Sequence, residues 1–177
     1  SRGLGDVYKR QMWSRSSQPT TRYNGYVFTS KDNMWFVKIN NKEFSFNFHP
    51  SDVDNITMNP AIKEKLLNTL MIYITFDPDN HPKYIDLARF SLSKAFQEKG
   101  IYVENCITKE NKDYFLPVVD CKNATKHVPV IKFELSENNE TNLILDGNCI
   151  IAKAKDDTDI IKLKDRLLYS ILNIVKE

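Results

Sequence analysis

From Tyr23 onward the apolar residues of the chain fall into short runs rich in aromatic and β-branched side chains. Three such runs lie between Tyr23 and Pro50, interrupted at residues 30–33 and 40–41. Residues 40 and 41 are both Asn, which tolerates a positive φ, so this interruption predicts a two-residue hairpin turn. The last run alternates apolar and polar residues as a half-buried strand does: Phe44, Ser45, Phe46, Asn47 and Phe48. The segment predicts an N-terminal three-strand meander ending at Pro50.

The hydrophobic period then changes. Residues 60–69 predict a short helix, with Asn59 as its cap and Pro60 at its first position. Residues 70–76, LMIYITF, form a continuous apolar run typical of a strand buried on both faces.

Residues 83–99 give the clearest helical pattern in the chain, and Gly100 ends it. The apolar stripe at helical spacing consists of Ile85, Ala88, Leu92, Ala95 and Phe96. Residues 101–108 then predict a second strand. A strand, a helix and a strand in this order indicate a right-handed crossover between parallel strands.

The C-terminal third returns to strands and ends in a helix. Residues 128–135 are expected to pair with residues 141–145 through the polar loop SENNE. The segment LILDGNCII contains Asp-Gly, a strong hairpin signal, and is apolar on both faces, so this hairpin is expected inside the sheet. Residues 157–175 predict the final helix. The fold class is therefore α/β (α+β mixed), with a mixed sheet covered by two principal helices.

The N-terminal residues have a different character. Residues 1–11, SRGLGDVYKRQ, lack apolar periodicity and resemble a translated sequencing adapter from short-read library preparation, which indicates a metagenomic gene fragment. Residues 12–22 have the Ser/Thr/Gln/Pro composition of a linker. Residues 23–177 are then a single α/β domain. Because the first eleven residues were joined in frame, a signal peptide or anchor is expected upstream of residue 12.

Charge and composition narrow the function classes. The chain has 25 Lys and Arg against 23 Asp and Glu, and residues 1–11 hold three of the former and one of the latter. The remainder is therefore balanced at 22 against 22, without the basic footprint of a nucleic-acid-binding protein. A hydrophobic content of 41% is enough for a core. No run of about eighteen apolar residues occurs that would span a membrane.

Sequons and cysteines point to an exported protein. Three Asn-X-Thr sequons fall in predicted loops and make candidate glycosylation sites of Asn55, Asn123 and Asn139. The three cysteines are Cys106, Cys121 and Cys149. In a cytosolic protein they would be inert buried thiols, whereas in an exported domain two would pair and one would remain.

A series of short motifs from about Tyr23 to the C-terminus resembles a family of uncharacterised archaeal proteins. The motifs are NGYVFT, FNFHPSDV, YITFDP, ENCITKEN, PVVDCKNAT, LDGNCII and DRLLYSILNI. The resemblance implies a membrane-anchored protein with a single N-terminal hydrophobic segment followed by an exported domain. Relatives carry a further cysteine between the first two, where this chain has KENKDYFLP, and this difference leaves Cys106 without a local partner.

The expected disulfide joins Cys121 to Cys149 and leaves Cys106 as a free thiol. Cys121 closes the PVVDC segment beside the sheet whose inner hairpin carries Cys149. The competing pair, Cys106 with Cys121, closes a shorter loop. The distance between Cα atoms decides between the two pairs, because a disulfide requires Cα atoms within about 7 Å.

Two segments of the sequence suggest an enzyme. The turn DPDNH places Asp77, Asp79 and His81 after a buried strand, where open α/β sheets bind ligands, and these side chains suit a divalent metal. The alternative is a helix-entry turn in which Asp and Asn accept from free amides. A Cys121–His127 nucleophile pair is chemically conceivable, but a disulfide explains the cysteine better.

The remaining enzyme signals are weak. His49 stands alone and is typical of a packed or surface histidine. The sequence contains no GxSxG, HExxH, Walker or dinucleotide-binding motif. We therefore expect a non-catalytic, membrane-anchored extracytoplasmic domain that requires no cofactor and contacts a protein or another envelope component. The alternative is a metal-dependent or hydrolytic enzyme centred on Asp77, Asp79 and His81.

Overall fold

The computed structural model describes residues 18–80 and 82–177. The chain divides between His49 and Pro50 into two compact units, where the sequence predicted a single domain over residues 23–177. The hydrophobic pattern cannot reveal such a boundary, because Pro50 follows the preceding strand after only a few residues. The predicted adapter, residues 1–11, lies outside the described residues, as does the linker up to residue 17.

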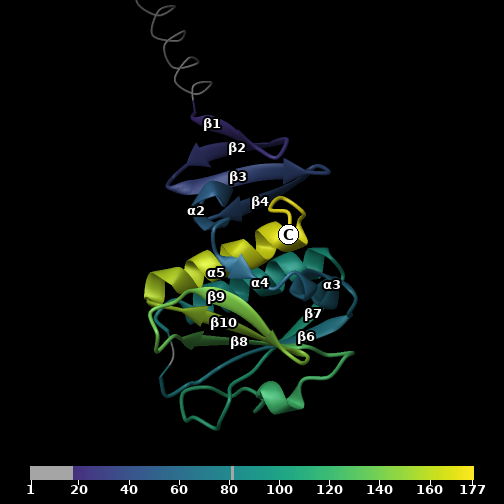
Figure 1. The fold of residues 1–177 in the computed structure, drawn as a ribbon, viewed down its shortest axis with the longest axis vertical. Helices are drawn as coiled ribbons and strands as arrows, with labels where there is room; N and C mark the ends of the chain where they lie inside the picture. The colour runs from purple at the N-terminus through teal and green to yellow at the C-terminus, as the bar shows by residue number, and fades with distance from the viewer. Residues whose placement is uncertain (1–17, 81) are drawn as a thin grey trace, which may run out of the picture. The chain divides into compact units, whose positions relative to one another are not determined.

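Within the described residues the smaller unit is a four-stranded antiparallel sheet in the order β1-β2-β3-β4 (Figure 1). Its strands are β1 (Thr20–Tyr23), β2 (Tyr26–Lys31), β3 (Met34–Ile39) and β4 (Lys42–Phe46). The predicted meander corresponds to β2, β3 and β4 and is confirmed. The linker prediction is wrong from Thr20 onward, since Thr20–Tyr23 pairs with β2.

Hairpin turns with positive φ at both central residues join these strands, as tight hairpins require. They lie at Asn24-Gly25, Asp32-Asn33 and Asn40-Asn41. The predicted Asn40-Asn41 turn is confirmed. Asn24-Gly25 is an equally strong turn signal in the sequence. This turn reverses the chain directly after Tyr23, so the preceding residues can pair with β2 as strand β1.

The two faces of this sheet differ in burial. Phe28, Val37 and Phe46 share one face and are almost completely buried. The imidazole of His49 packs edge-on to aromatic rings on that face, at 5.4 Å from Phe28 and 4.7 Å from Trp35. His49 is thus a packed histidine, as its isolated position in the sequence suggested.

In the part of the chain that the structure describes, the larger unit contains a six-stranded mixed sheet in the order β5-β9-β10-β8-β6-β7. The strands are β5 (Thr57–Met58), β6 (Met71–Phe76), β7 (Tyr102–Asn105), β8 (Val130–Leu135), β9 (Asn142–Asp146) and β10 (Cys149–Ala154). The predicted mixed α/β class is therefore shown.

The strand–helix–strand crossover forms as predicted. Helix α4 (Ile85–Glu98) connects β6 to the parallel strand β7. The buried residues of α4 are Ile85, Ala88, Leu92 and Phe96, which are four of the five residues in the predicted stripe. Gly100 follows the helix with φ +74°, a conformation that L-residues with a Cβ rarely adopt.

The shorter helices are α2 (Pro50–Val53), which the sequence analysis missed, and α3 (Ala61–Leu67). Helix α3 has Pro60 at its N-cap, one residue after the predicted cap Asn59, although the Oδ1 atom of Asn59 does accept from the Ala61 N–H at 2.9 Å.

The predicted pairing of residues 128–135 with residues 141–145 is wrong. Strand β8 pairs in parallel with both β10 and β6, whereas β9 pairs with β10 and β5. The β9–β10 hairpin predicted from LILDGNCII does form, and β10 lies between β9 and β8. Its two apolar faces favour this interior position, which separates two strands that are neighbours in sequence.

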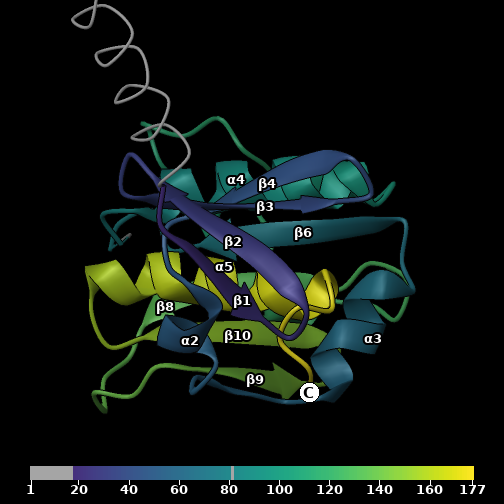
Figure 2. The same ribbon diagram turned by 90° about the horizontal axis from the view of Figure 1, so that it is seen from above.

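Helices α4 and α5 (Asp157–Ile171) lie on one face of the six-stranded sheet, as Figures 1 and 2 show. The connection from β7 to β8, residues 106–129, crosses the other face and contains the short 3-10 helix η1 (Cys121–Asn123). This long irregular segment carries two of the three cysteines.

Candidate functional site

The carboxylates proposed as metal ligands in the enzyme alternative contact a lysine. The Nζ atom of Lys109 lies 3.0 Å from Oδ2 of Asp79 and 3.5 Å from Oδ1 of Asp77. Asn111 donates through Nδ2 to Oδ1 of Asp79 at 2.8 Å. The backbone N–H of Asp79 donates to Oδ1 of Asp77 at 2.9 Å, as in a helix-entry turn. His81 lies outside the described residues.

These contacts shift the pKa values of Asp79 and Lys109. The hydrogen bond from Lys109 holds the pKa of Asp79 below its usual value, and the bond from Asn111 adds to this effect. The same contact with Asp79 raises the pKa of Lys109. An ammonium group thus occupies the space between the two carboxylates. Among residues 18–80 and 82–177, no group of three or more His, Cys, Asp or Glu side chains is arranged to hold a metal ion.

Aromatic packing fixes the neighbouring loop. The ring of Tyr114 packs edge-on to Phe76 at 5.2 Å between centroids. The guanidinium of Arg89 lies 5.9 Å from the centroid of each ring, and its Nε donates to Asp86 at 2.8 Å. Burial raises the pKa of Tyr114, and the Asp86 carboxylate adds to the shift. These contacts tie residues 106–117 to β6 and α4, which is a structural role.

The predicted disulfide between Cys121 and Cys149 is confirmed, with Cα atoms 5.2 Å apart. It joins η1 to the first residue of β10. Cys149 is buried in an apolar cluster with Val119 and Val130. The disulfide therefore attaches the irregular connection to the centre of the sheet.

Cys106 is the free cysteine, and it is completely buried. Burial raises the pKa of its thiol to about 12, and the nearby Glu104 carboxylate contributes to the shift. Its Sγ lies 3.5 Å from the backbone oxygen of Glu104. A thiol with so high a pKa is almost entirely protonated near neutral pH and is a poor nucleophile.

The disulfide also occupies the sulfur of the proposed Cys121–His127 nucleophile pair. The Oδ1 atom of Asn123 accepts from the Asp120 N–H at 2.9 Å, and the Asp120 side chain accepts from the Cys121 N–H at 2.7 Å. The first bond is one half of the N-terminal capping box of η1, and in the other half the Asp120 side chain accepts from the Asn123 backbone N–H. His127 contributes its backbone oxygen to Thr69. The segment is therefore organised as a structural support.

The three sequon asparagines are exposed, as expected for glycosylation candidates. Asn55 lies in the turn after α2, Asn123 ends η1, and Asn139 lies in the loop between β8 and β9 with φ +59°. Thr141, the third residue of the last sequon, donates to Asp159 at 2.6 Å. In the folded protein that hydroxyl is engaged, so modification of Asn139 is favoured before folding.

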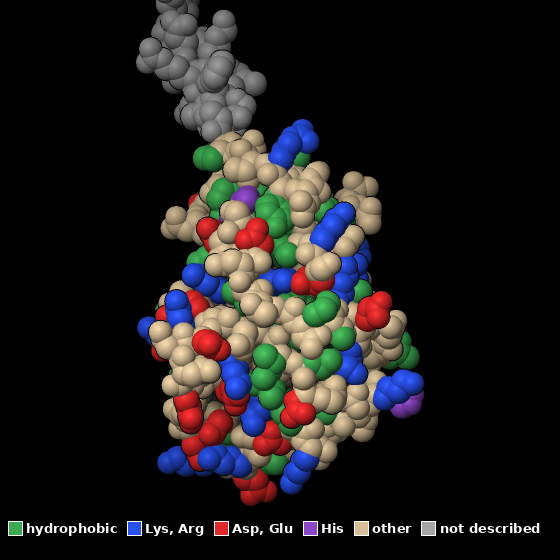
Figure 3. Space-filling model, viewed as in Figure 1, with side chains coloured by type: hydrophobic (Ala, Val, Ile, Leu, Met, Phe, Trp, Pro, Cys, Tyr) green, Lys and Arg blue, Asp and Glu red, His purple; other side chains and the backbone are tan. Residues whose placement is uncertain are grey.

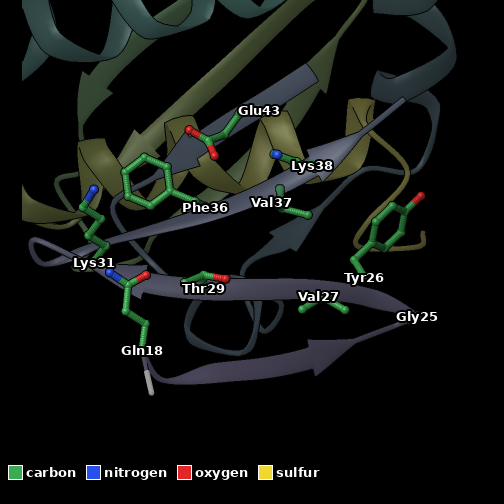
Figure 4. Close-up of a pocket in the computed structure, with 10 residues that line it drawn as sticks. All are labelled: Gln18, Gly25, Tyr26, Val27, Thr29, Lys31, Phe36, Val37, Lys38 and Glu43. Carbon is green, nitrogen blue, oxygen red and sulfur yellow. The ribbon is translucent and has the colours of Figure 1, made fainter. Parts of the chain in front are cut away.

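A hollow that the sequence analysis missed lies on the outward face of the small sheet (Figure 4). Its volume is about 610 Å³, and it is lined only by residues of the smaller unit. Strand register places Thr29 opposite Phe36 and Lys38 opposite Glu43. Because paired residues of antiparallel strands share a face, these side chains all point away from the buried face.

Two aromatic residues, Tyr26 and Phe36, line the hollow together with charged and polar groups. Phe36 is half-buried, whereas Lys31, Lys38 and Glu43 are exposed. The alternating pattern of β2 and β3 could have revealed this face, because successive side chains of a strand point to opposite faces of the sheet. Figure 3 shows that positive and negative side chains are interspersed on the visible face of the larger unit.

Comparisons of the chain with protein families, with curated proteins and with solved structures gave no match. No helix within residues 18–80 and 82–177 has the length and apolar character needed to cross a membrane.

Proposed function

We propose that this protein is an extracytoplasmic domain of the cell envelope that acts by binding rather than by catalysis. The observation that carries the proposal is the Cys121–Cys149 disulfide. Structural disulfides persist in oxidising compartments and are rare in a reducing cytosol. The resemblance to membrane-anchored archaeal proteins adds a single N-terminal anchor to this proposal.

The position of the disulfide explains why the fold needs it. The connection between β7 and β8 contains little regular structure, and segments of this length are uncommon in compact domains. The hydroxyl of Thr75 donates to the Val119 oxygen at 2.7 Å, and Lys132 pairs with Asp120 at 3.0 Å. The backbone N–H groups of Cys106 and Thr108 also donate to the Ile74 and Phe76 oxygens of β6. The disulfide adds a covalent link between η1, in the middle of the segment, and β10.

The part of the proposal that favours binding over catalysis is supported by the contacts of the side chains that were candidates for catalysis. Lys109 lies against both carboxylates of the Asp77 turn, and a disulfide holds the sulfur of Cys121. The thiol of Cys106 is buried and protonated. Each of these reactive groups thus has a structural role.

The test is a thiol count combined with a stability measurement. The chain, produced under oxidising conditions, denatured and alkylated without reductant, should show one modified thiol by intact mass, at Cys106. Replacing Cys121 and Cys149 together by Ala should lower the Tm by about 6–12 °C, because the 28-residue separation gives roughly 3–4 kcal/mol of chain-entropy stabilisation.

Cys106→Ala is the matched control for loss of sulfur. This substitution removes a buried thiol but breaks no covalent link, so it should lower the Tm by less than the double substitution does. Three alkylated thiols, or a double variant within about 2 °C of the parent, would contradict the exported assignment.

A further inference from the structure

We propose that the hollow on the outward face of the β1–β4 sheet binds a carboxylate-bearing sugar unit of an acidic polysaccharide. This inference rests on the proposed function, since it assigns a ligand class to the envelope-binding domain. It is carried by the Phe36 ring and the two ammonium groups of Lys31 and Lys38, which line a hollow of ligand size (Figure 4).

The aromatic ring supplies the apolar part of the site. Phe36 is half-buried, and its neighbours across the sheet, Thr29 and Ser45, are small and leave the ring face accessible. The C–H groups on one side of a pyranose ring form a flat apolar surface that packs well against an aromatic face. Val27, which is 45% exposed, extends this apolar surface along β2.

The charged groups indicate an anion. Lys31 and Lys38 line the hollow with a single acidic residue, Glu43, so the lining carries one net positive charge. Arg22 lies opposite Val27 on the same face and adds another. Residues 12–177 as a whole are balanced at 22 basic against 22 acidic side chains, so this excess is local. A sugar carboxylate would pair with the lysines, while Glu43 and Thr29 would accept or donate hydrogen bonds to hydroxyl groups.

The shape of the site favours a sugar over a membrane surface. An interfacial membrane contact requires apolar side chains that protrude into the headgroup region. Phe36 is instead half-buried, with Lys31, Lys38 and Glu43 around it (Figure 4). Glu43 would also be repelled by a sheet of anionic headgroups.

The experiment is an amide NMR titration of the chain with trigalacturonate, compared with the same trisaccharide fully methyl-esterified. Esterification keeps the sugar rings and removes the negative charges. Trigalacturonate should shift amide signals of β2 and β3 saturably, with a Kd on the order of 1 mM. Its affinity should fall as NaCl is raised from about 50 to 500 mM, because salt screens exposed charges. The ester should bind at least about fivefold more weakly.

Variants locate the site. Lys31→Gln combined with Lys38→Gln should weaken trigalacturonate binding about tenfold, and Phe36→Leu about threefold, because leucine keeps the apolar volume but removes the flat ring. Lys42→Gln is the matched control. Lys42 belongs to the same sheet but pairs with Ile39 on the face opposite the hollow, so this variant should bind trigalacturonate as tightly as the parent does. Melting curves establish that each variant is folded.

Absence of saturable shifts, equal binding of the ester, or unchanged affinity in the lysine double variant would overturn the proposal. Binding to phosphatidylglycerol vesicles that depends on the same lysines, without binding of trigalacturonate, would also overturn it in favour of a lipid phosphate. The thiol count is independent of these titrations. A failure here with one alkylatable thiol leaves the proposed function intact, whereas three alkylatable thiols contradict that function directly.

Discussion

At the scale of single residues, the α4 stripe shows how helical spacing selects the side chains that pack. Leu92 and Phe96 are four residues apart and completely buried, while Lys94 between them is exposed. The ammonium of Lys94 lies 5.7 Å from the ring centroid of Phe90 on the outer surface. Position on the helix therefore determines the cost of a substitution more than side-chain size does.

Phe96→Ala should destabilise the protein by about 3–5 kcal/mol, because it removes a buried ring and leaves a cavity. Lys94→Ala should change the free energy of unfolding by less than about 0.5 kcal/mol. Urea denaturation of the two variants measures both values. Equal effects would mean that the helix has another face toward the sheet.

Glu177 gives a residue-scale prediction about pH. Its Oε2 accepts from Nη1 of Arg166 at 2.9 Å, and the second oxygen accepts from Nη2. Burial by itself raises the pKa of Glu177, but the hydrogen bonds from Arg166 and Ser170 and the positive charge of Arg166 together outweigh it, so the pKa lies below its usual value of 4.5. A lowered carboxylate pKa stabilises the fold above the unfolded-state pKa, and this stabilisation is lost as the pH falls through the folded-state pKa.

Glu177→Gln should therefore lower the Tm at pH 7, and the difference from the parent should shrink as the pH falls from about 5 to 3. Melting curves across this range test the prediction. A difference that stays constant with pH would show that the carboxylate charge has no role.

At the scale of elements, β1 illustrates how a short turn adds a strand. The Asn24-Gly25 turn has φ values of 48° and 84°, and it folds Thr20–Tyr23 back onto β2. The β1 side chains are largely exposed, so the strand is held mainly by its backbone pairing with β2 rather than by burial. The linker composition of this segment is compatible with an edge strand, because one side of such a strand faces water.

Deletion of residues 1–23 should lower the Tm by a few degrees and accelerate amide exchange in β2, because the deletion exposes the β2 backbone edge. Deletion of residues 1–11, which resemble a sequencing adapter, should leave both unchanged. Hydrogen exchange followed by mass spectrometry distinguishes the two deletions. Equal protection of β2 in both would show that β1 adds nothing to the sheet.

At the scale of the whole molecule, polar contacts occupy the two carboxylates that the enzyme alternative requires. The Asp77 and Asp79 carboxylates face Lys109, and the pKa of Asp79 is lowered accordingly. A divalent ion would have to displace this ammonium group and the hydrogen bond from Asn111. Competition of this kind disfavours metal binding by the turn.

Titration with Zn²⁺, Mn²⁺ or Ca²⁺ up to about 1 mM should therefore produce no saturable rise in the Tm, since only a ligand that binds the native state stabilises it. Asp77→Ala is the informative variant. A saturable rise in the parent that disappears in Asp77→Ala would restore the metal-dependent alternative.

The sequence by itself determined the features that depend on neighbouring residues. Period and turn chemistry predicted the β2–β4 meander, the α4 stripe, the β9–β10 hairpin and the C-terminal helix. These elements form because the 3.6-residue and 2-residue periods place apolar side chains on one face. The Cys121–Cys149 pair was also expected from the sequence, because Cys149 lies in the inner hairpin of the sheet, and the Cα distance of 5.2 Å decides for it over Cys106–Cys121.

Only the tertiary structure decided which distant segments meet. Strand β10 pairs with β8 because its two apolar faces gain most from a central position, and no local signal distinguishes this order from a simple β8–β9 hairpin. Lys109 reaches the Asp77 turn from a different loop, and β2, β3 and β4 together create the hollow around Phe36. Contacts of this kind depend on chain closure over long separations, and the local period carries no information about them.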